Sequence, residues 1–373
     1  MEKERISSLQ MTMLIYPTVV ATAILSVPSI TAYYAPHDLW MSPIFSSIVG
    51  FITVFIAYKL YKLYPKETII QSVEKIIGKV PGKIIGFFIL FFYIMTTGEI
   101  IRDYSEFIVG SFLFKTPTVV ITGTMVLLCA ATVHAGLEVL GRLAQLFFPL
   151  FVIPLFIFFL LLIPNYDIKN IFPILEHGIL PPLKGSIILG GWFSELFLIT
   201  FFLPFLKDEK KVLKHGFTNV LAIMVTLVLV NLTVLFVLGV ATASKVYPLM
   251  NVGRYISYAD FFENLESVIM AVWIVGAFIK ISVAYYAVVI GTAQWLNLSD
   301  YKLIIWPIAI LIVEFSFWSL PSSMRNFMIA ITVYAPYSIF MQTVLPFFLL
   351  LIALFRKRKK KKTKITTNTS KSS

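Results

Sequence analysis

The sequence predicts an all-α polytopic membrane protein with about ten transmembrane helices, and three observations lead to this fold class. Hydrophobic residues make up 58% of the 373-residue chain and charged residues only 13%, whereas about a quarter of the residues in a soluble domain are charged. The apolar residues form long runs without the alternation of barrel strands. Lys and Arg gather between alternate runs. Because backbone groups inside hydrocarbon need internal hydrogen-bond partners, these runs are predicted to be helices.

Each apolar run is long enough to cross a bilayer. The first run is too long for the apolar region of a signal peptide, so we expect it to remain as the first span. Between the second and third runs, the segment TIIQSVEKIIG follows Pro65 and ends at Gly78, a pattern that predicts a short amphipathic helix. The predicted spans are residues 9–33, 41–63, 84–112, 117–135, 138–163, 186–206, 216–243, 267–291, 303–320 and 327–355.

The basic residues predict the orientation of the chain. An even number of spans places both termini on one side, and that side would carry 23 Lys and Arg residues against six on the other, Arg325 among them. The positive-inside rule therefore predicts that both termini are cytoplasmic. We expect one permease-like membrane domain over residues 1–355 and a basic cytoplasmic tail over residues 356–373. A basic cluster directly after a helix favours anionic lipid as its partner, not nucleic acid.

Two spans contain stretches that weaken a helix. The first span contains ATAILSVPS, and the sixth contains GSIILGGWFSE. Either stretch alone is also typical of close packing through small residues. Because they lie five spans apart, together they predict broken first and sixth helices, two repeats over about 9–163 and 186–355, and a binding site at the membrane midplane. The candidate binding residues in these stretches are Thr22, Ala23, Ile24, Leu25, Ser26, Gly190, Gly191, Trp192, Phe193 and Glu195.

Charged residues within the spans need a partner or a function, because inserting each one costs about 2.5–3.5 kcal/mol. In the third span, Glu99, Arg102, Asp103 and Glu106 lie on one helical face, since residues three and four apart are neighbours on a helix. This face is predicted either to line an outer vestibule or to form a local ionic network.

Three further charged residues, Glu195, Lys280 and Glu314, lie near the centres of the sixth, eighth and ninth spans. Lys280 is the only cation among them, so one carboxylate is expected to pair with it. The pair would either belong to the binding site or only fix the packing of the helices. The candidate residues outside the two weakened stretches are Thr97, Glu99, Lys280 and Ser282.

The sequence contains no pattern that indicates an enzyme, a metal site or a cofactor. The four histidines and the single cysteine, Cys129, lack the spacing of metal ligands. No Ser/His/Asp arrangement or phosphate-binding loop is found.

Four stretches together carry a resemblance to a known family: ATAILSVP, TTGEIIRDYSEF, GGWFSE and VWIVGAFIKISVAYY. Their order and spacing over roughly residues 5–355 resemble the membrane permease subunit, or B subunit (GerAB-type), of spore germinant receptors. This family is a branch of the amino-acid/polyamine/organocation transporter superfamily. Members of the superfamily usually have a Gly-rich sequence at the first break, where this chain has Ala21 and Ala23.

The resemblance implies a five-plus-five inverted repeat, with a small nutrient such as an amino acid bound between the first and sixth helices. It implies two partner subunits in the spore inner membrane. In this fold the sixth and eighth helices flank the central site, which favours Glu195 over Glu314 as the partner of Lys280. Sodium-coupled relatives bind a cation between the first and eighth helices, and the Lys280 ammonium would take the same electrostatic role.

The predicted function is therefore a nutrient-sensing subunit that binds a germinant and triggers germination. Two alternatives stay open: an autonomous proton-coupled amino-acid transporter, and an ion or water channel gated by a ligand. Pocket polarity depends on helix rotation, so the sequence does not identify the germinant.

Overall fold

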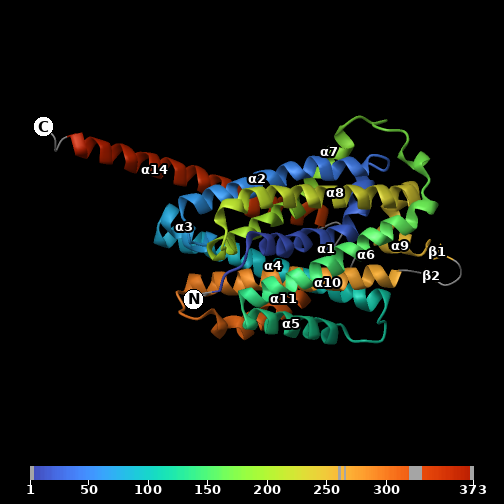
Figure 1. Ribbon diagram of the computed structural model, residues 1–373, viewed down its shortest axis with the longest axis horizontal. Coiled ribbons are helices and arrows are strands. Elements are labelled where there is room, and N and C mark those ends of the chain that lie inside the picture. The colour runs from blue at the N-terminus through green and yellow to red at the C-terminus, as the bar shows by residue number, and fades with distance from the viewer. Residues whose placement is uncertain (1–3, 259–261, 264–265, 319–329, 370–373) are drawn as a thin grey trace.

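The computed structural model describes residues 4–258, 262–263, 266–318 and 330–369. Within these residues, ten helices are long and apolar enough to cross a membrane, as predicted. They lie roughly side by side, and both termini lie at the same end of the bundle (Figure 1). The first nine spans are α1 (Ser8–Tyr34), α2 (Ser42–Leu63, preceded by η1, Leu39–Met41), α4 (Lys79–Ser111), α5 (Thr118–Ala135), α6 (Leu137–Leu162), α7 with η4 (Leu180–Ser194 and Glu195–Phe201), α8 (Val212–Leu238), α10 (Glu266–Leu296) and α11 (Ile305–Trp318).

The tenth span is built from four consecutive segments: the π-helical turn η9 (Ala330–Tyr334), α13 (Ala335–Ile339), a second π-helical turn η10 (Phe340–Val344) and α14 (Leu345–Thr369). The predicted end of the ninth span, the predicted start of the tenth and Arg325 lie outside the described residues. The third and sixth helices begin earlier than predicted. In the sixth, prolines occupy the first turn after Leu180, where their missing N–H groups have no helical role.

The connections between the spans contain short helices and one small hairpin. The predicted amphipathic helix is present as α3 (Ile69–Ile77), which begins with a capping box at Thr68 and ends at Gly78. The strands are only two residues long, β1 (Ser257–Tyr258) and β2 (Phe262–Glu263), and pair antiparallel, so the all-α class is confirmed. The remaining connections are η2 (Ile163–Asn165), η3 (Ile168–Ile171), η5 (Leu203–Phe205), η6 (Glu209–Lys211), η7 (Gly239–Ser244), α9 (Pro248–Gly253) and η8 (Tyr301–Ile304).

The first and sixth spans form the centre of the bundle. The most apolar window of each is 83% buried, against 28–61% for the other eight. The helix α1 packs against α6, α7, α8 and α10, which surround it in Figure 1. Residues on these two spans are therefore shielded from lipid on most sides, which is where polar side chains are tolerated at membrane depth.

Helix contacts occur in matched pairs. The packing of α1 on α8 has its counterpart in that of α7 on α2, and the packing of α6 on α1 in that of α13 on α7. Likewise, α5 contacts α10 and α11 contacts α4. Two inverted five-helix halves produce such pairs, because the first span then corresponds to the sixth, the second to the seventh, and so on. The bounds of the repeats, about 9–163 and 186–355, stay a prediction.

The predicted break in the first helix is wrong, since α1 is one continuous helix despite Pro17 and Pro28. Each proline removes only one helical hydrogen bond. Neighbouring hydroxyl groups bond to the carbonyls of the same turns: Ser26 donates to Thr22 O at 3.2 Å and Thr31 donates to Val27 O at 2.8 Å. The sixth span does change conformation, passing from α-helix to 3₁₀-helix at Glu195.

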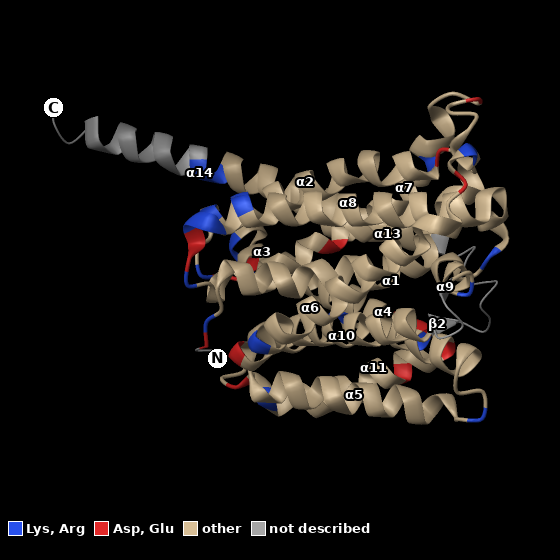
Figure 2. Cartoon of the chain, turned by 45° about the vertical axis from the view of Figure 1, so that its right-hand side comes forward, with Lys and Arg blue, Asp and Glu red and all other residues tan. Residues whose placement is uncertain are grey.

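Basic residues gather at the end of the bundle that carries the termini (Figure 2). The middle of α14 is attached there, because Arg356 donates to Ile76 O and Lys357 donates to Leu63 O. The Lys357 ammonium also lies 5.5 Å from the ring centroid of Tyr64. Side chains from Arg358 onward, most of the predicted basic cluster, lie outside the described residues.

At the same end, the N-terminal segment connects the first span to the loop after the sixth. Ile6 N donates to Phe205 O at 3.0 Å. The backbone N–H and the hydroxyl of Ser8 both donate to the Asp208 carboxylate, at 2.6 and 2.7 Å. Partial burial opposes ionisation of Asp208, but the hydrogen bonds from Ser8 and the charge of Lys211 outweigh it and lower the pKa of that carboxyl. The two central spans are thus held together at this end.

Candidate functional site

A buried ion pair joins the sixth and eighth spans near mid-membrane. The Lys280 ammonium on α10 lies 2.7 Å from Oε2 and 3.0 Å from Oε1 of Glu195, the first residue of η4. The two residues are only 2% and 3% exposed. The sequence left Glu195 and Glu314 as alternatives, and the structure confirms Glu195. Glu314 is exposed on α11.

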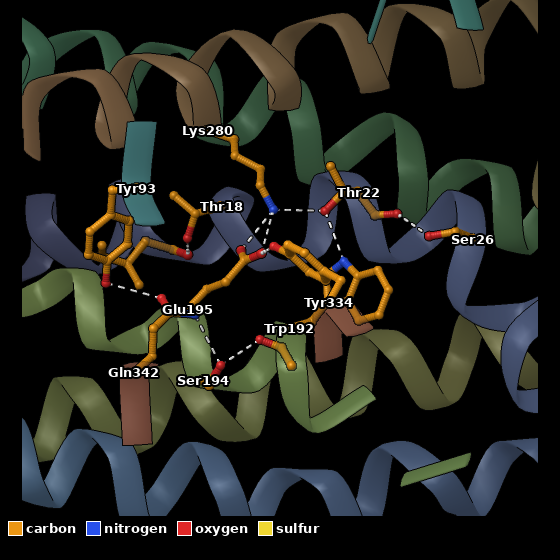
Figure 3. A network of polar contacts seen from close by, with 12 residues as sticks. Thr18, Thr22, Ser26, Tyr93, Trp192, Ser194, Glu195, Lys280, Tyr334 and Gln342 are labelled. Carbon is orange, nitrogen blue, oxygen red and sulfur yellow. Dashed lines mark hydrogen bonds and ion pairs between the residues drawn. The ribbon is translucent and has the colours of Figure 1, made fainter. Parts of the chain in front are cut away.

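The first span supplies a third partner for the ammonium. Lys280 Nζ donates to the Thr22 hydroxyl oxygen at 2.8 Å, and the same oxygen accepts from Trp192 Nε1 at 3.1 Å. An ammonium has three donors and no acceptor, and these contacts supply partners for all of them. Thr22 therefore connects α1 to both α7 and α10, at the centre of the network in Figure 3.

The tenth span also reaches the pair, a contact that sequence reasoning missed. The Tyr334 hydroxyl donates to Glu195 Oε1 at 3.3 Å, and its ring lies edge-on to Trp192 with centroids 6.1 Å apart. One tyrosine in an apolar span gives no sequence signal of its partner. Its position beside Glu195 depends on how the tenth span packs against the sixth.

A second polar chain, also missed, lies beside the ion pair. The Tyr93 hydroxyl donates to Gln342 Oε1, the Gln342 amide donates to the Ser194 hydroxyl, both at 3.1 Å, and Ser194 donates to Gly191 O at 2.6 Å. Tyr93, Gln342 and Ser194 are all buried. The chain links the third, tenth and sixth spans where the sixth changes helix type (Figure 3). A glutamine within an apolar run is the one sequence signal that indicates it.

The two adjacent glycines of the sixth span allow the tenth span to pack closely. A Cβ added at Gly191 would lie 3.0 Å from Ala335 Cα, and one added at Gly190 would lie 3.1 Å from Ile339 Cδ1. Both distances are shorter than ordinary van der Waals contacts. The glycines thus serve helix packing against α13.

Several predicted residues lie nearby without joining the network. Ala23, Ile24 and Leu25 are buried in the hydrophobic core. Phe193 faces α2, since a Cβ added at Gly50 would lie 2.8 Å from its ring.

Three predicted polar residues lie outside the network: Ser26 and Thr97 bond within their own helices, and the buried Ser282 hydroxyl has no hydrogen-bond partner among the described residues. Ser26 donates to a carbonyl of its own helix. Thr97 likewise donates to Tyr93 O at 2.6 Å, and Ser282 faces the thiol of Cys129 on α5.

The charged face of α4 forms an ionic contact of its own. Arg102 Nε is 2.6 Å from Glu106 Oε1, so part of the predicted local network is present. Asp103, on the same face, has an exposed side chain. The outer vestibule predicted for this face stays a prediction.

The site carries one positive and one negative charge and is suited to binding. Within the described residues, no three His, Cys, Asp or Glu side chains gather as metal ligands would. What the arrangement offers is a buried ammonium, a buried carboxylate and a buried indole, together with the partly buried hydroxyl groups of Thr22 and Tyr334, at the junction of four spans. Removing either charge leaves the other unpaired in a medium that solvates it poorly.

We predict strong coupling between Lys280 and Glu195. Lys280→Met or Glu195→Gln alone should lower the free energy of unfolding by about 3–5 kcal/mol, whereas the double variant should be nearly neutral because no buried charge is left unpaired. The test is a double-mutant cycle on unfolding midpoints in detergent. A matched cycle of Lys280→Met with Glu314→Gln should be additive. Additive losses for Lys280 and Glu195 would show that they do not interact.

Comparison with known proteins identifies the family. A family model described as "Spore germination protein" matches residues 5–324. Spore germination protein KB of Bacillus subtilis (strain 168) is 24% identical over 377 residues, covering 98% of each chain. Spore germination protein YndE of the same organism is 26% identical over 361 residues, covering 95% of this chain and 98% of that protein.

Solved structures share the fold. A Na⁺-coupled sialic acid symporter in a substrate-bound outward-open state matches with a TM-score of 0.64 at 14% identity, covering 92% of this chain and 88% of that one. MhsT in complex with L-phenylalanine matches with a TM-score of 0.62 at 13% identity, covering 95% and 99%. At such identities the likeness shows the fold alone. The family match spans most of the chain, and the chain belongs to the spore germination permease family.

Proposed function

We propose that this germination-related membrane protein senses a small zwitterionic nutrient, such as an amino acid, at the Lys280–Glu195 pair and passes a conformational signal to other receptor subunits. The observation that carries the proposal is the pair itself, buried where the first, sixth, eighth and tenth spans meet. A permanent structural contact does not require two charges there, because apolar residues of similar volume stabilise a core at least as well.

The charges of the pair suit a zwitterion. Its carboxylate would take the place of Glu195 at the Lys280 ammonium, and its ammonium would take the place of Lys280 at the Glu195 carboxylate. No buried charge would be left unpaired by this exchange, which keeps the desolvation cost low. A neutral sugar offers no such exchange. The complex of MhsT with L-phenylalanine supports the proposal to the extent that a protein of this fold holds an amino acid.

Exchange of partners at the pair provides a route to a conformational signal. Thr22 accepts from both Lys280 and Trp192, so a shift of the ammonium would loosen the contact between α1, α7 and α10. A ligand shifts a conformational equilibrium only by its difference in affinity for the two states. Here the difference would come from ion-pair contacts that only one state offers.

Sodium is unnecessary in this mechanism. Lys280 reaches from α10 to Thr22 of α1, and its ammonium supplies a positive charge between the two spans. The proposed setting is the spore inner membrane, with both termini cytoplasmic and the basic tail on anionic lipid, because 23 Lys and Arg residues lie on the side of the termini. We propose no catalytic role.

A second candidate is a proton-coupled amino-acid transporter, which the likeness to a symporter favours. The third is a ligand-gated ion or water channel. All three need a ligand at the same place, and they differ in what crosses the membrane afterwards.

The purified chain, reconstituted in liposomes, should bind at least one of the twenty proteinogenic amino acids without concentrating it. Binding is measured as a thermal shift across the amino acids, sugars and monovalent ions, and flux with radiolabelled amino acids under a proton gradient. The double variant Lys280→Met with Glu195→Gln is the control and should lose the shift. Concentrative uptake would support the transporter, and downhill ion flux the channel. A thermal shift that the double variant retains would place the ligand elsewhere.

A side chain at Gly191 should disrupt the nutrient response. Gly191→Leu would force the sixth span away from Ala335 and displace Glu195, so spores that carry the variant should fail to germinate while the protein still inserts into the membrane. The control is Gly110→Leu, because nothing lies within 4 Å of a Cβ added at Gly110. Normal germination of the Gly191→Leu spores would contradict the assignment of the site.

A further inference from the structure

The tenth span has an irregular backbone where it passes the site. Two π-helical turns, η9 and η10, flank the five residues of α13. A π-turn carries an extra residue compared with a regular α-helical turn, and such turns are frequent at functional sites. A helix with one on each side of a short segment has two places where its hydrogen bonding can change.

Each π-turn makes polar contacts with the site or its surroundings. Tyr334, the last residue of η9, donates to Glu195. In η10, Gln342 bonds to Tyr93 and Ser194, while the Thr343 hydroxyl lies 2.6 Å from that of Thr53 on α2. The second π-turn, η10, is thus attached to three other spans, whereas Tyr334 of η9 contacts the site through one hydrogen bond, to Glu195, and one edge-on ring contact, with Trp192.

The segment between the two π-turns packs against backbone that carries no side chains. Ala335 and Ile339 face Gly191 and Gly190, which present no side chains. Transfer of a π-turn across α13 would move that segment by one residue, which rotates it by about 100° and shifts it by roughly 1.5 Å. On the C-terminal side of η10, α14 continues to Arg356 and Lys357. These two residues donate hydrogen bonds to carbonyl groups at the ends of α3 and α2.

We infer that Tyr334 is a positioning residue that couples the state of Glu195 to the register of α13. While Glu195 is held by Lys280, the Tyr334 hydroxyl donates to it and fixes the present register. When Glu195 changes partner, the hydrogen bond is lost and the segment shifts along the two glycines. The role of a nutrient in this change rests on the proposed function; the coupling of Tyr334 to Glu195 does not.

Hydrogen–deuterium exchange of the full-length protein in detergent tests the coupling without a ligand. Glu195→Gln should change the exchange rates of amides in residues 330–344 by about 5-fold or more, the lower end of typical allosteric coupling. Tyr334→Phe should produce the same change on its own, because it removes the same hydrogen bond, and it should abolish any further response to Glu195→Gln. Tyr337→Phe, in the same segment, should preserve it. Amides of α5 report any general destabilisation, and unfolding midpoints show that each variant folds.

The coupling is overturned if Glu195→Gln leaves residues 330–344 unchanged, or if Tyr334→Phe and Tyr337→Phe behave alike. A separate arm adds an equimolar mixture of the twenty proteinogenic amino acids to the wild-type protein. A change in residues 330–344 extends the coupling to nutrient binding. No change in that arm, together with the expected result for Glu195→Gln, would contradict the proposed amino-acid ligand and leave the coupling supported.

Discussion

Burying an ammonium and a carboxylate within a membrane protein constrains everything packed around them. Lys280 and Glu195 are 2% and 3% exposed, so each depends on the other and on neighbouring hydroxyl groups for the solvation that water would otherwise give. Their geometry requires α10 and η4 to lie within reach of one ion pair, and requires α1 to present Thr22 between them. The pair therefore fixes how the sixth and eighth spans meet, its hydrogen bond to Thr22 joins them to the first span, and any change in its partners must move helices.

The neighbouring features follow from this constraint. Trp192 and Tyr334 lie beside the pair: Tyr334 donates a hydrogen bond to Glu195, and Trp192 donates one to Thr22, the hydroxyl that also accepts from Lys280. The change from α-helix to 3₁₀-helix at Glu195 frees backbone groups, and the hydroxyl of Ser194 bonds to one of them, Gly191 O. Close packing of α13 on the two glycines brings Tyr334 within reach of the carboxylate. The contacts that stabilise the ion pair are thus the same contacts that would change if the pair exchanged partners.

The sequence predicted the fold class and the spans because an apolar run of this length must cross the membrane as a helix. It predicted Lys280 and Glu195 because charged side chains in hydrocarbon need a partner or a function. It could not decide between Glu195 and Glu314, since depth along a helix says nothing of which way a side chain faces. It missed Tyr334, Gln342 and Tyr93 because each is a single polar residue whose partners lie on distant spans. The break predicted in the first helix failed because a proline removes only one hydrogen bond, and nearby hydroxyl groups bond to the carbonyls.

The central claim is that Lys280 and Glu195 form an ion pair, not a neutral hydrogen-bonded contact. Infrared difference spectroscopy of the wild-type protein against Glu195→Gln measures this directly, because a carboxylate and a protonated carboxyl group absorb at different frequencies. We expect the substitution to remove a carboxylate band and no protonated carboxyl band. Loss of a protonated carboxyl band instead would contradict the ion pair and the exchange of partners built on it.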